Sequence, residues 1–256
     1  MTPISPTPRL NVGLSLALMA VPLMLLAARP PADKIPAAGG DITIAPIGHA
    51  TLQITHANHV IDIDPVAGDY AGLAAPSLIV ITDIHGDHMD APTIAKVRKP
   101  ETTIVAPAAV ASKLDAAALG SGKPIVMANG DTKTVDGITI EAVPMYNLTR
   151  GPAAGQLFHD KGRGNGYVLT IGGKRIYLAG DTEGIPEMRA LKNIDVAFVP
   201  MNLPYTMTPA EAADAVKAFH PKIVYPYHYR GQDANEFAKA LAGTGIDVRL
   251  RDWYVK

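Results

Sequence analysis

The feature that most constrains the fold is the segment ITDIHGDHMD at residues 81–90. It continues the apolar run of residues 77–81, and within six residues it carries two carboxylates and two imidazoles, which belong to Asp83, His85, Asp87 and His88. Such groups are costly to bury without a partner. In a loop at the end of a buried strand they can all point at one centre. The segment therefore predicts a metal or catalytic centre at a strand end.

Three further residues lie in matching contexts. Asp181 ends the apolar segment RIYLAGD, His228 ends KIVYPYH, and His159 lies in the loop LFHDKGRGNG. One such residue taken alone more often caps an element or completes a hydrogen bond. The whole set, placed at strand ends and in a loop, instead indicates a single site.

The composition limits the chemistry of that site. The 256 residues include no cysteine, which excludes disulfides, thiolate zinc sites and cysteine nucleophiles. A metal must therefore be held by His, Asp, Glu or Asn. The net charge is −1 and no long run of one sign occurs, which argues against a nucleic-acid-binding surface and against a polybasic membrane patch.

The apolar segments predict a β-rich first half and an alternation of strands and helices towards the end. This order fits two sheets covered by helices on their outer faces. Asp136-Gly137 and Gly172-Gly173 predict hairpin turns. Thr208, Pro209 and Glu211 predict a helix start, and residues 108–119 predict another helix.

The glycine-rich segment GRGNG at residues 162–166 resembles a nucleotide-binding loop only faintly. A dinucleotide-binding loop follows a strand and opens a helix, whereas this segment precedes the strand predicted at residues 167–171. It is therefore predicted to be a flexible loop.

Residues 1–40 are predicted to be a signal peptide and linker. Arg9 precedes an apolar run at residues 12–28, and a segment rich in Pro, Ala and Gly follows. The domain at residues 41–256 is then exported, and the periplasm is its expected location. The run is close to the lower length limit for a membrane span, so an uncleaved membrane anchor is the alternative.

Three motifs together resemble the metallo-β-lactamase superfamily, whose hallmark is His-x-His-x-Asp-His after a strand. DIHGDH, the GDT of residues 180–182 and the YPYH of residues 225–228 match that pattern in order. IGHATLQI and IDIDP also resemble the branch that contains ascorbate-phosphate lactonase-like and phospholipase D-like hydrolases. The resemblance implies an α/β fold, the four-layer αββα sandwich, over residues 41–256.

The resemblance also implies two metal positions. The second takes Asp87, His88 and His228, and Asp181 bridges to the first, which takes Asp83, His85 and either His159 or Asn147. Asp83 departs from the pattern, because a histidine is expected there. Two zinc ions are the expected cofactor, with manganese or iron as alternatives because three carboxylates make the site harder.

The activity implied by the resemblance is hydrolysis by a metal-bound hydroxide, with Asp87 as the catalytic residue that orients it. The substrate class is an ester, lactone or phosphodiester rather than a β-lactam, and the partner is a small, anionic molecule. Candidate substrate-binding residues are His49, Tyr146 and Arg230, together with Lys161 and Arg163. The alternative is a periplasmic metal- or ligand-binding protein with a degenerate first metal position.

Overall fold

The computed structural model describes residue 1 and residues 30–254. The predicted signal peptide at residues 12–28 lies outside the described residues. Within the described part of the chain, no helix is both long enough and apolar enough to cross a membrane.

Two seven-stranded mixed sheets form the centre of the molecule, and each follows the order of its strands in the chain. The first sheet contains β1 (Asp33–Ile35), β2 (Ile42–Gly48), β3 (Thr51–His56), β4 (His59–Ile63), β5 (Leu78–Val80), β6 (Thr103–Ala106) and β7 (Ile125–Val126). The second sheet contains β8 (Thr132–Val135), β9 (Ile138–Met145), β10 (Gly164–Ile171), β11 (Lys174–Leu178), β12 (Val196–Pro200), β13 (Ile223–Tyr227) and β14 (Asp247–Val248). Strands β4 to β7 and β11 to β14 pair in parallel.

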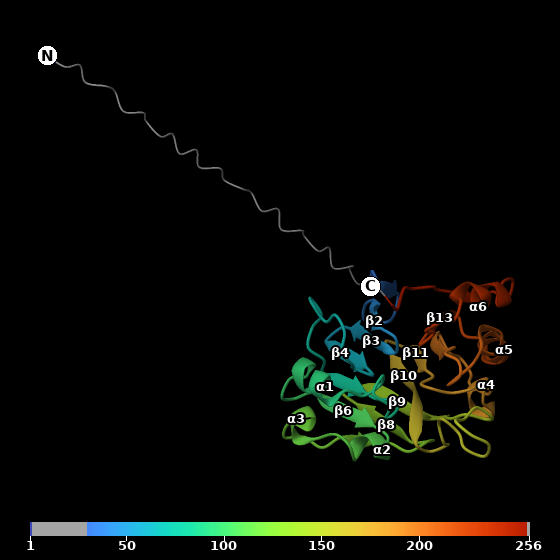
Figure 1. Cartoon of the computed structure of the whole chain (residues 1–256), viewed down its shortest axis with the longest axis horizontal. Helices are drawn as coiled ribbons and strands as arrows, with labels where there is room; N and C mark the ends of the chain where they lie inside the picture. The colour runs from blue at the N-terminus through green and yellow to red at the C-terminus, as the bar shows by residue number, and fades with distance from the viewer. Residues whose placement is uncertain (2–29, 255–256) are drawn as a thin grey trace.

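Helices cover the outer face of each sheet, as Figure 1 shows. The first sheet carries α1 (Ala91–Val97), α2 (Ala108–Ala111) and α3 (Ala116–Leu119), and the second carries α4 (Pro186–Arg189), α5 (Pro209–Phe219) and α6 (Ala234–Ala240). One apolar core, with Leu52 and Phe198, lies between the sheets, and two others lie under the helices. The four-layer αββα sandwich is confirmed.

Local sequence signals explain where several elements begin and end. The predicted start of α5 is confirmed, because the Thr208 side chain accepts from the Glu211 amide and the Glu211 carboxylate accepts from the Thr208 amide. The predicted helix at residues 108–119 is wrong as a single element. The Asp115 side chain accepts from the Ala118 amide, so it caps a new helix, α3, and separates it from α2.

The glycine-rich segment at residues 162–166 is a loop only in part, because β10 already begins at Gly164. A Cβ on Gly166 would lie 2.8 Å from the carbonyl oxygen of Ala179. Glycine therefore permits a close approach between backbones at this point of the second sheet.

The linker that was predicted to reach residue 40 is shorter than expected. Strand β1 lies within residues 1–40, where it pairs with β2 and buries Ile35. The carboxylate of Asp33 accepts from the Arg251 guanidinium at the other end of the chain, with Oδ1 2.5 Å from Nη2. The described domain therefore includes residues before Asp41.

The buried carboxylate of Asp62 in β4 should make the free energy of unfolding depend on pH. Its carboxylate is fully buried, accepts one hydrogen bond from Gln53 and leaves Oδ2 without a partner, so burial raises its pKa to about 6. The folded state thus binds a proton that the unfolded state releases, and Asp62 lowers stability as pH rises from about 4 to about 6. We expect Asp62→Asn to be about 2 kcal/mol more stable than the parent at pH 7.5 and nearly equal at pH 4. Urea unfolding at both pH values measures this, and an equal difference at both would contradict it.

Candidate metal centre

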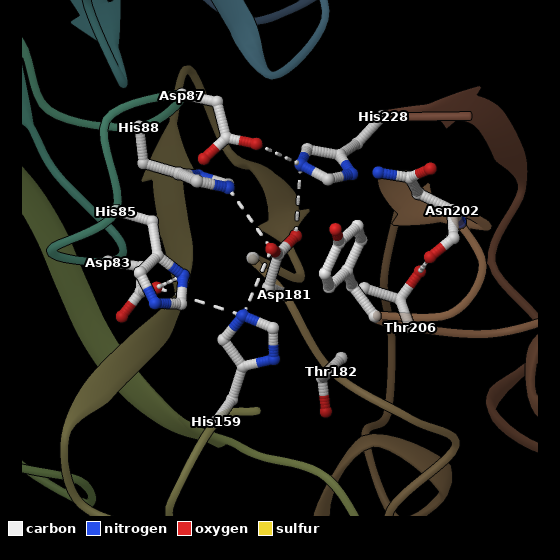
Figure 2. Close-up of polar contacts among 12 residues, drawn as sticks. Asp83, His85, Asp87, His88, His159, Asp181, Thr182, Asn202, Thr206 and His228 are labelled. Carbon is white, nitrogen blue, oxygen red and sulfur yellow. Dashed lines mark hydrogen bonds and ion pairs between the residues drawn. The ribbon is translucent and has the colours of Figure 1, made fainter. Parts of the chain in front are cut away.

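The seven predicted ligands lie together at one edge of the two sheets, at the carboxyl ends of parallel strands. Figure 2 shows the side chain of Asp181 at the middle of the group, surrounded by histidines from several loops. The set comprises Asp83, His85, Asp87, His88, His159, Asp181 and His228. Strands β5, β11 and β13 hold most of them, because parallel strands place the loops after their carboxyl ends side by side.

The candidate second metal position comprises His88, Asp181 and His228, whose donor atoms lie within 4.8 Å of one another. Asp181 Oδ2 lies 3.4 Å from His88 Nε2, and Asp181 Oδ1 lies 3.3 Å from His228 Nε2. Asp87 Oδ2 lies 3.3 Å from the same His228 nitrogen. Asp87 is thus close enough to join the set.

The candidate first metal position comprises Asp83, His85 and His159, again with donor atoms within 4.8 Å. Asp83 Oδ2 lies 2.9 Å from His85 Nδ1 and 3.8 Å from His159 Nε2. Asp181 Oδ2 lies 3.2 Å from His159 Nε2, so the Asp181 carboxylate contacts both positions. That placement is the one expected of a bridging carboxylate.

The donor atoms of these side chains fit a metal. Three buried atoms that face the centre, His88 Nε2, His159 Nε2 and Asp181 Oδ1, make no hydrogen bond of ordinary geometry among the described residues. Their only contacts are ion pairs within the candidate ligand set, at 3.2–3.4 Å. Buried polar atoms are rarely left unpaired, and a cation would satisfy all three. Imidazole and carboxylate ligands without thiolate suit zinc, manganese or iron.

Two outer residues orient these imidazoles. His88 Nδ1 lies 2.8 Å from Asp64 Oδ2, and Asp64 also accepts from the amide and hydroxyl of Thr82. His159 Nδ1 donates to Asn147 Oδ1 at 2.7 Å, which leaves Nε2 directed at the metal position. Hydrogen bonds of this kind fix the tautomer and the ring orientation of metal ligands. Asn147 is therefore placed to support His159 and not to replace it.

Asp64 was not identified from the sequence, although a signal existed. It stands at the end of a strand in IDIDP, the same context that identified Asp181. Asp64, His49 and His228 all have positive φ, at 46°, 52° and 48°. This conformation costs L-residues about 1–2 kcal/mol each and tends to occur at functional sites.

The imidazoles hold the carboxylates of the metal-free centre in their ionised form. Burial alone would raise the pKa of Asp83, but the hydrogen bond from His85 and the charges of His88 and Arg163 lower it to about 2. Burial disfavours the charged form of His88, but Asp181 and Asp64 raise its pKa well above that of an ordinary imidazole. The metal-free centre therefore keeps a proton that a metal has to displace.

The candidate substrate-binding residues divide into two groups. His49 and Arg230 line a cavity of about 790 Å³ that opens over the metal positions. His49 is buried, with Nε2 3.2 Å from Asp87 Oδ2 and Nδ1 2.6 Å from the Tyr254 hydroxyl. Tyr146 does not line this cavity, because its hydroxyl donates to Glu187. The structure therefore does not support the prediction that Tyr146 contacts the substrate.

The other two cations are also paired. Lys161 donates to Glu187 at 2.5 Å and lies over the ring of Tyr146. Arg163 pairs with Asp83, and its Nη2 lies 3.2 Å from Asp83 Oδ2. Both positive charges are therefore already paired with carboxylates and are not directed into the cavity.

Comparison with known proteins agrees with this geometry. The family model described as a beta-lactamase superfamily domain matches residues 43–228. The chain belongs to the metallo-β-lactamase superfamily. It is 34% identical over 218 residues to the UPF0173 metal-dependent hydrolase of Thermococcus onnurineus. The matched residues cover 79% of this chain and 92% of that protein.

Solved structures of the superfamily share the fold of this member. A crystal structure described as that of a proposed metal-dependent hydrolase from Parabacteroides distasonis has a TM-score of 0.79 and 45% identity, and it covers 87% of this chain and 99% of its own. The metallo hydrolase Igni18 from Ignicoccus hospitalis matches with a TM-score of 0.67 at 23% identity, over 82% of this chain and 94% of the Igni18 chain. At this identity the match supports the fold alone.

Proposed function

We propose that this superfamily member hydrolyses an ester, lactone or phosphodiester bond with two zinc ions. The observation that carries the proposal is the position of Asp181, whose two oxygens contact histidines of both metal positions. Metal ions held there would lower the pKa of a water towards 7 and polarise a substrate oxygen.

The residues around the cavity have complementary tasks in this reaction. The Asp87 side chain is 45% exposed and faces the cavity, so its free oxygen can accept a hydrogen bond from the attacking water. As the water attacks, Asp87 can take that proton and then pass it to the leaving oxygen. His49 contacts Asp87 and is fixed by Tyr254, so it keeps the carboxylate in place.

The cavity walls suggest an anionic substrate with an apolar part. Arg230 lines the cavity and is exposed; its guanidinium lies over the ring of Tyr254, and within the described chain it forms no ion pair with a carboxylate. The apolar part of the lining includes Pro152, Leu157, Phe158, Leu203, Pro204 and Tyr205. Leu203 and Tyr205 are also exposed, so their apolar surface is open to a ligand in the cavity.

Replacement of Arg230 tests this substrate class. We expect Arg230→Gln to raise KM for an anionic substrate about tenfold, because one charge-assisted hydrogen bond is lost, and to leave KM for a neutral ester unchanged. Bis(p-nitrophenyl) phosphate and p-nitrophenyl butyrate are suitable probes. Arg189→Gln is the control, since Arg189 pairs with Asp214 away from the cavity. Equal effects on both substrates would argue against a role for Arg230 in charge recognition.

The alternative function is that of a metal- or ligand-binding protein, which the departure at Asp83 favours. Metal analysis of the purified protein, followed by turnover assays with chromogenic lactone, ester, phosphodiester and β-lactam substrates, separates the two. Two ions per chain with turnover support the hydrolase. Bound metal without turnover on any of these substrates supports the binding protein, and absence of metal contradicts both.

We also propose export to the periplasm, on the basis of the apolar run at residues 12–28. The cavity requires only a small-molecule partner, and the net charge of −1 gives no reason to invoke nucleic acid. Mass spectrometry of the N-terminus of the protein from its own cells would show whether the run is removed or kept as an anchor.

A further inference from the structure

The first metal position contains a charge that the superfamily pattern lacks. Asp83 stands where DIHGDH departs from His-x-His-x-Asp-His, so a carboxylate replaces a neutral imidazole. Asp83 is fully buried, and a buried carboxylate needs a compensating partner. The partner is Arg163, which lies in the glycine-rich segment just before β10.

The two side chains meet in a forked arrangement. Arg163 Nε lies 3.4 Å from Asp83 Oδ1, and Nη2 lies 3.2 Å from Oδ2. The same Oδ2 atom is the one that lies 2.9 Å from His85 and 3.8 Å from His159. A cation at the first position would therefore share Oδ2 with the guanidinium.

The pair also balances the charge of the centre. Asp83 adds one negative charge to those of Asp87 and Asp181, and Arg163 adds one positive charge beside it. The sum for Asp83 and Arg163 is zero, as it would be for a neutral histidine. No other cation forms an ion pair with Asp83 in the described residues apart from the candidate ligands His85 and His159.

We propose that Asp83 and Arg163 together replace the missing histidine, and that Arg163 weakens metal binding at the first position by competing for the Asp83 carboxylate. The centre then loads in order, with the His88, Asp181 and His228 position filled before the Asp83, His85 and His159 position. This inference rests on the proposed metal centre but does not depend on which bond is hydrolysed.

Removal of the Arg163 charge should strengthen the first position. Arg163→Met keeps the length of the apolar stem, and we expect it to lower the dissociation constant of the weaker metal by about 10–100-fold, the usual scale for residues that support metal ligands. Asp83→His alone leaves Arg163 unpaired beside a cation, so it should weaken the same step. Asp83→His combined with Arg163→Met should bind at least as tightly as the parent.

The test is a cobalt(II) titration of the full domain, followed by absorbance and by calorimetry, so that metal binding is measured without turnover. His159→Gln lacks a ligand of the first position, so the metal-binding step that it loses is the step at that position. Arg189→Met is the matched arginine control. Circular dichroism checks that each variant is folded. If Arg163→Met does not fold, Arg163→Gln is used in its place.

The inference is overturned if neither Arg163 variant lowers the weaker dissociation constant by more than twofold. It is also overturned if Asp83→His has the same effect with and without Arg163. If no cobalt binds to the parent, the metal centre and this inference fail together. If two ions bind and respond as expected without hydrolysis of any substrate, only the proposed function fails.

Discussion

Asp87→Asn is expected to lower kcat/KM by about a thousandfold or more while leaving the fold intact. Loss of a group that takes and returns a proton costs about 10²–10⁴-fold, and Asp87 is also a candidate metal ligand. The fold should survive, because the side chain is 45% exposed and its ion pairs within the described residues are with His49 and His228.

The matched control for this variant is Asp136→Asn. Asp136 is exposed in the turn between β8 and β9, where asparagine tolerates its positive φ. Turnover of the Asp87 variant within a few-fold of the parent would show that another group handles the proton. Metal analysis of the same sample would tell whether any loss of activity comes from lost metal or from lost proton transfer.

The fold and most of the metal centre could be predicted from the sequence for a simple reason. DIHGDH and GDT follow apolar strands and YPYH closes one, and parallel strands carry their carboxyl ends to the same edge of a sheet. A strand-end motif therefore fixes both the identity of a side chain and its place in the molecule.

Residues in long connections could not be placed in this way. The segment from Tyr146 to Arg163 joins β9 and β10, and its order in the chain does not say which side chains face the cavity. His159 faces the metal position because Asn147 holds its ring, whereas Tyr146 is directed towards Glu187 in α4. The first outcome depends on a partner twelve residues away in the same segment, and the second on a partner in α4, so neither follows from the local pattern.

The role of Arg163 could not be predicted from the sequence either. Its neighbours in GRGNG suggested a flexible loop, and nothing in the local pattern pointed to Asp83, which lies 80 positions earlier. The superfamily pattern alone would suggest that a histidine at position 83 is the better metal ligand. The contact with Arg163 argues otherwise, because an imidazole there would face an uncompensated guanidinium.

Removal of metal is expected to lower the melting temperature of the parent by about 10 °C at pH 8. A ligand at 1,000 times its dissociation constant stabilises the folded state by about 4 kcal/mol, and 1 kcal/mol shifts a domain of this size by about 2–4 °C. Asp181→Asn should show less than a third of this shift, because Asp181 contacts histidines of both metal positions.

The shift should also depend on pH in a definite direction. The raised pKa of His88 means that the metal-free protein holds a proton there, which a metal must displace. Acid favours that proton, so the metal-induced shift should be smaller at pH 5.5 than at pH 8. Differential scanning calorimetry with and without chelator, at both pH values, measures the parent, Asp181→Asn and the Asp136→Asn control. A full shift in Asp181→Asn would mean that Asp181 does not join the two positions, and a larger shift at pH 5.5 would mean that metal binding does not displace the His88 proton.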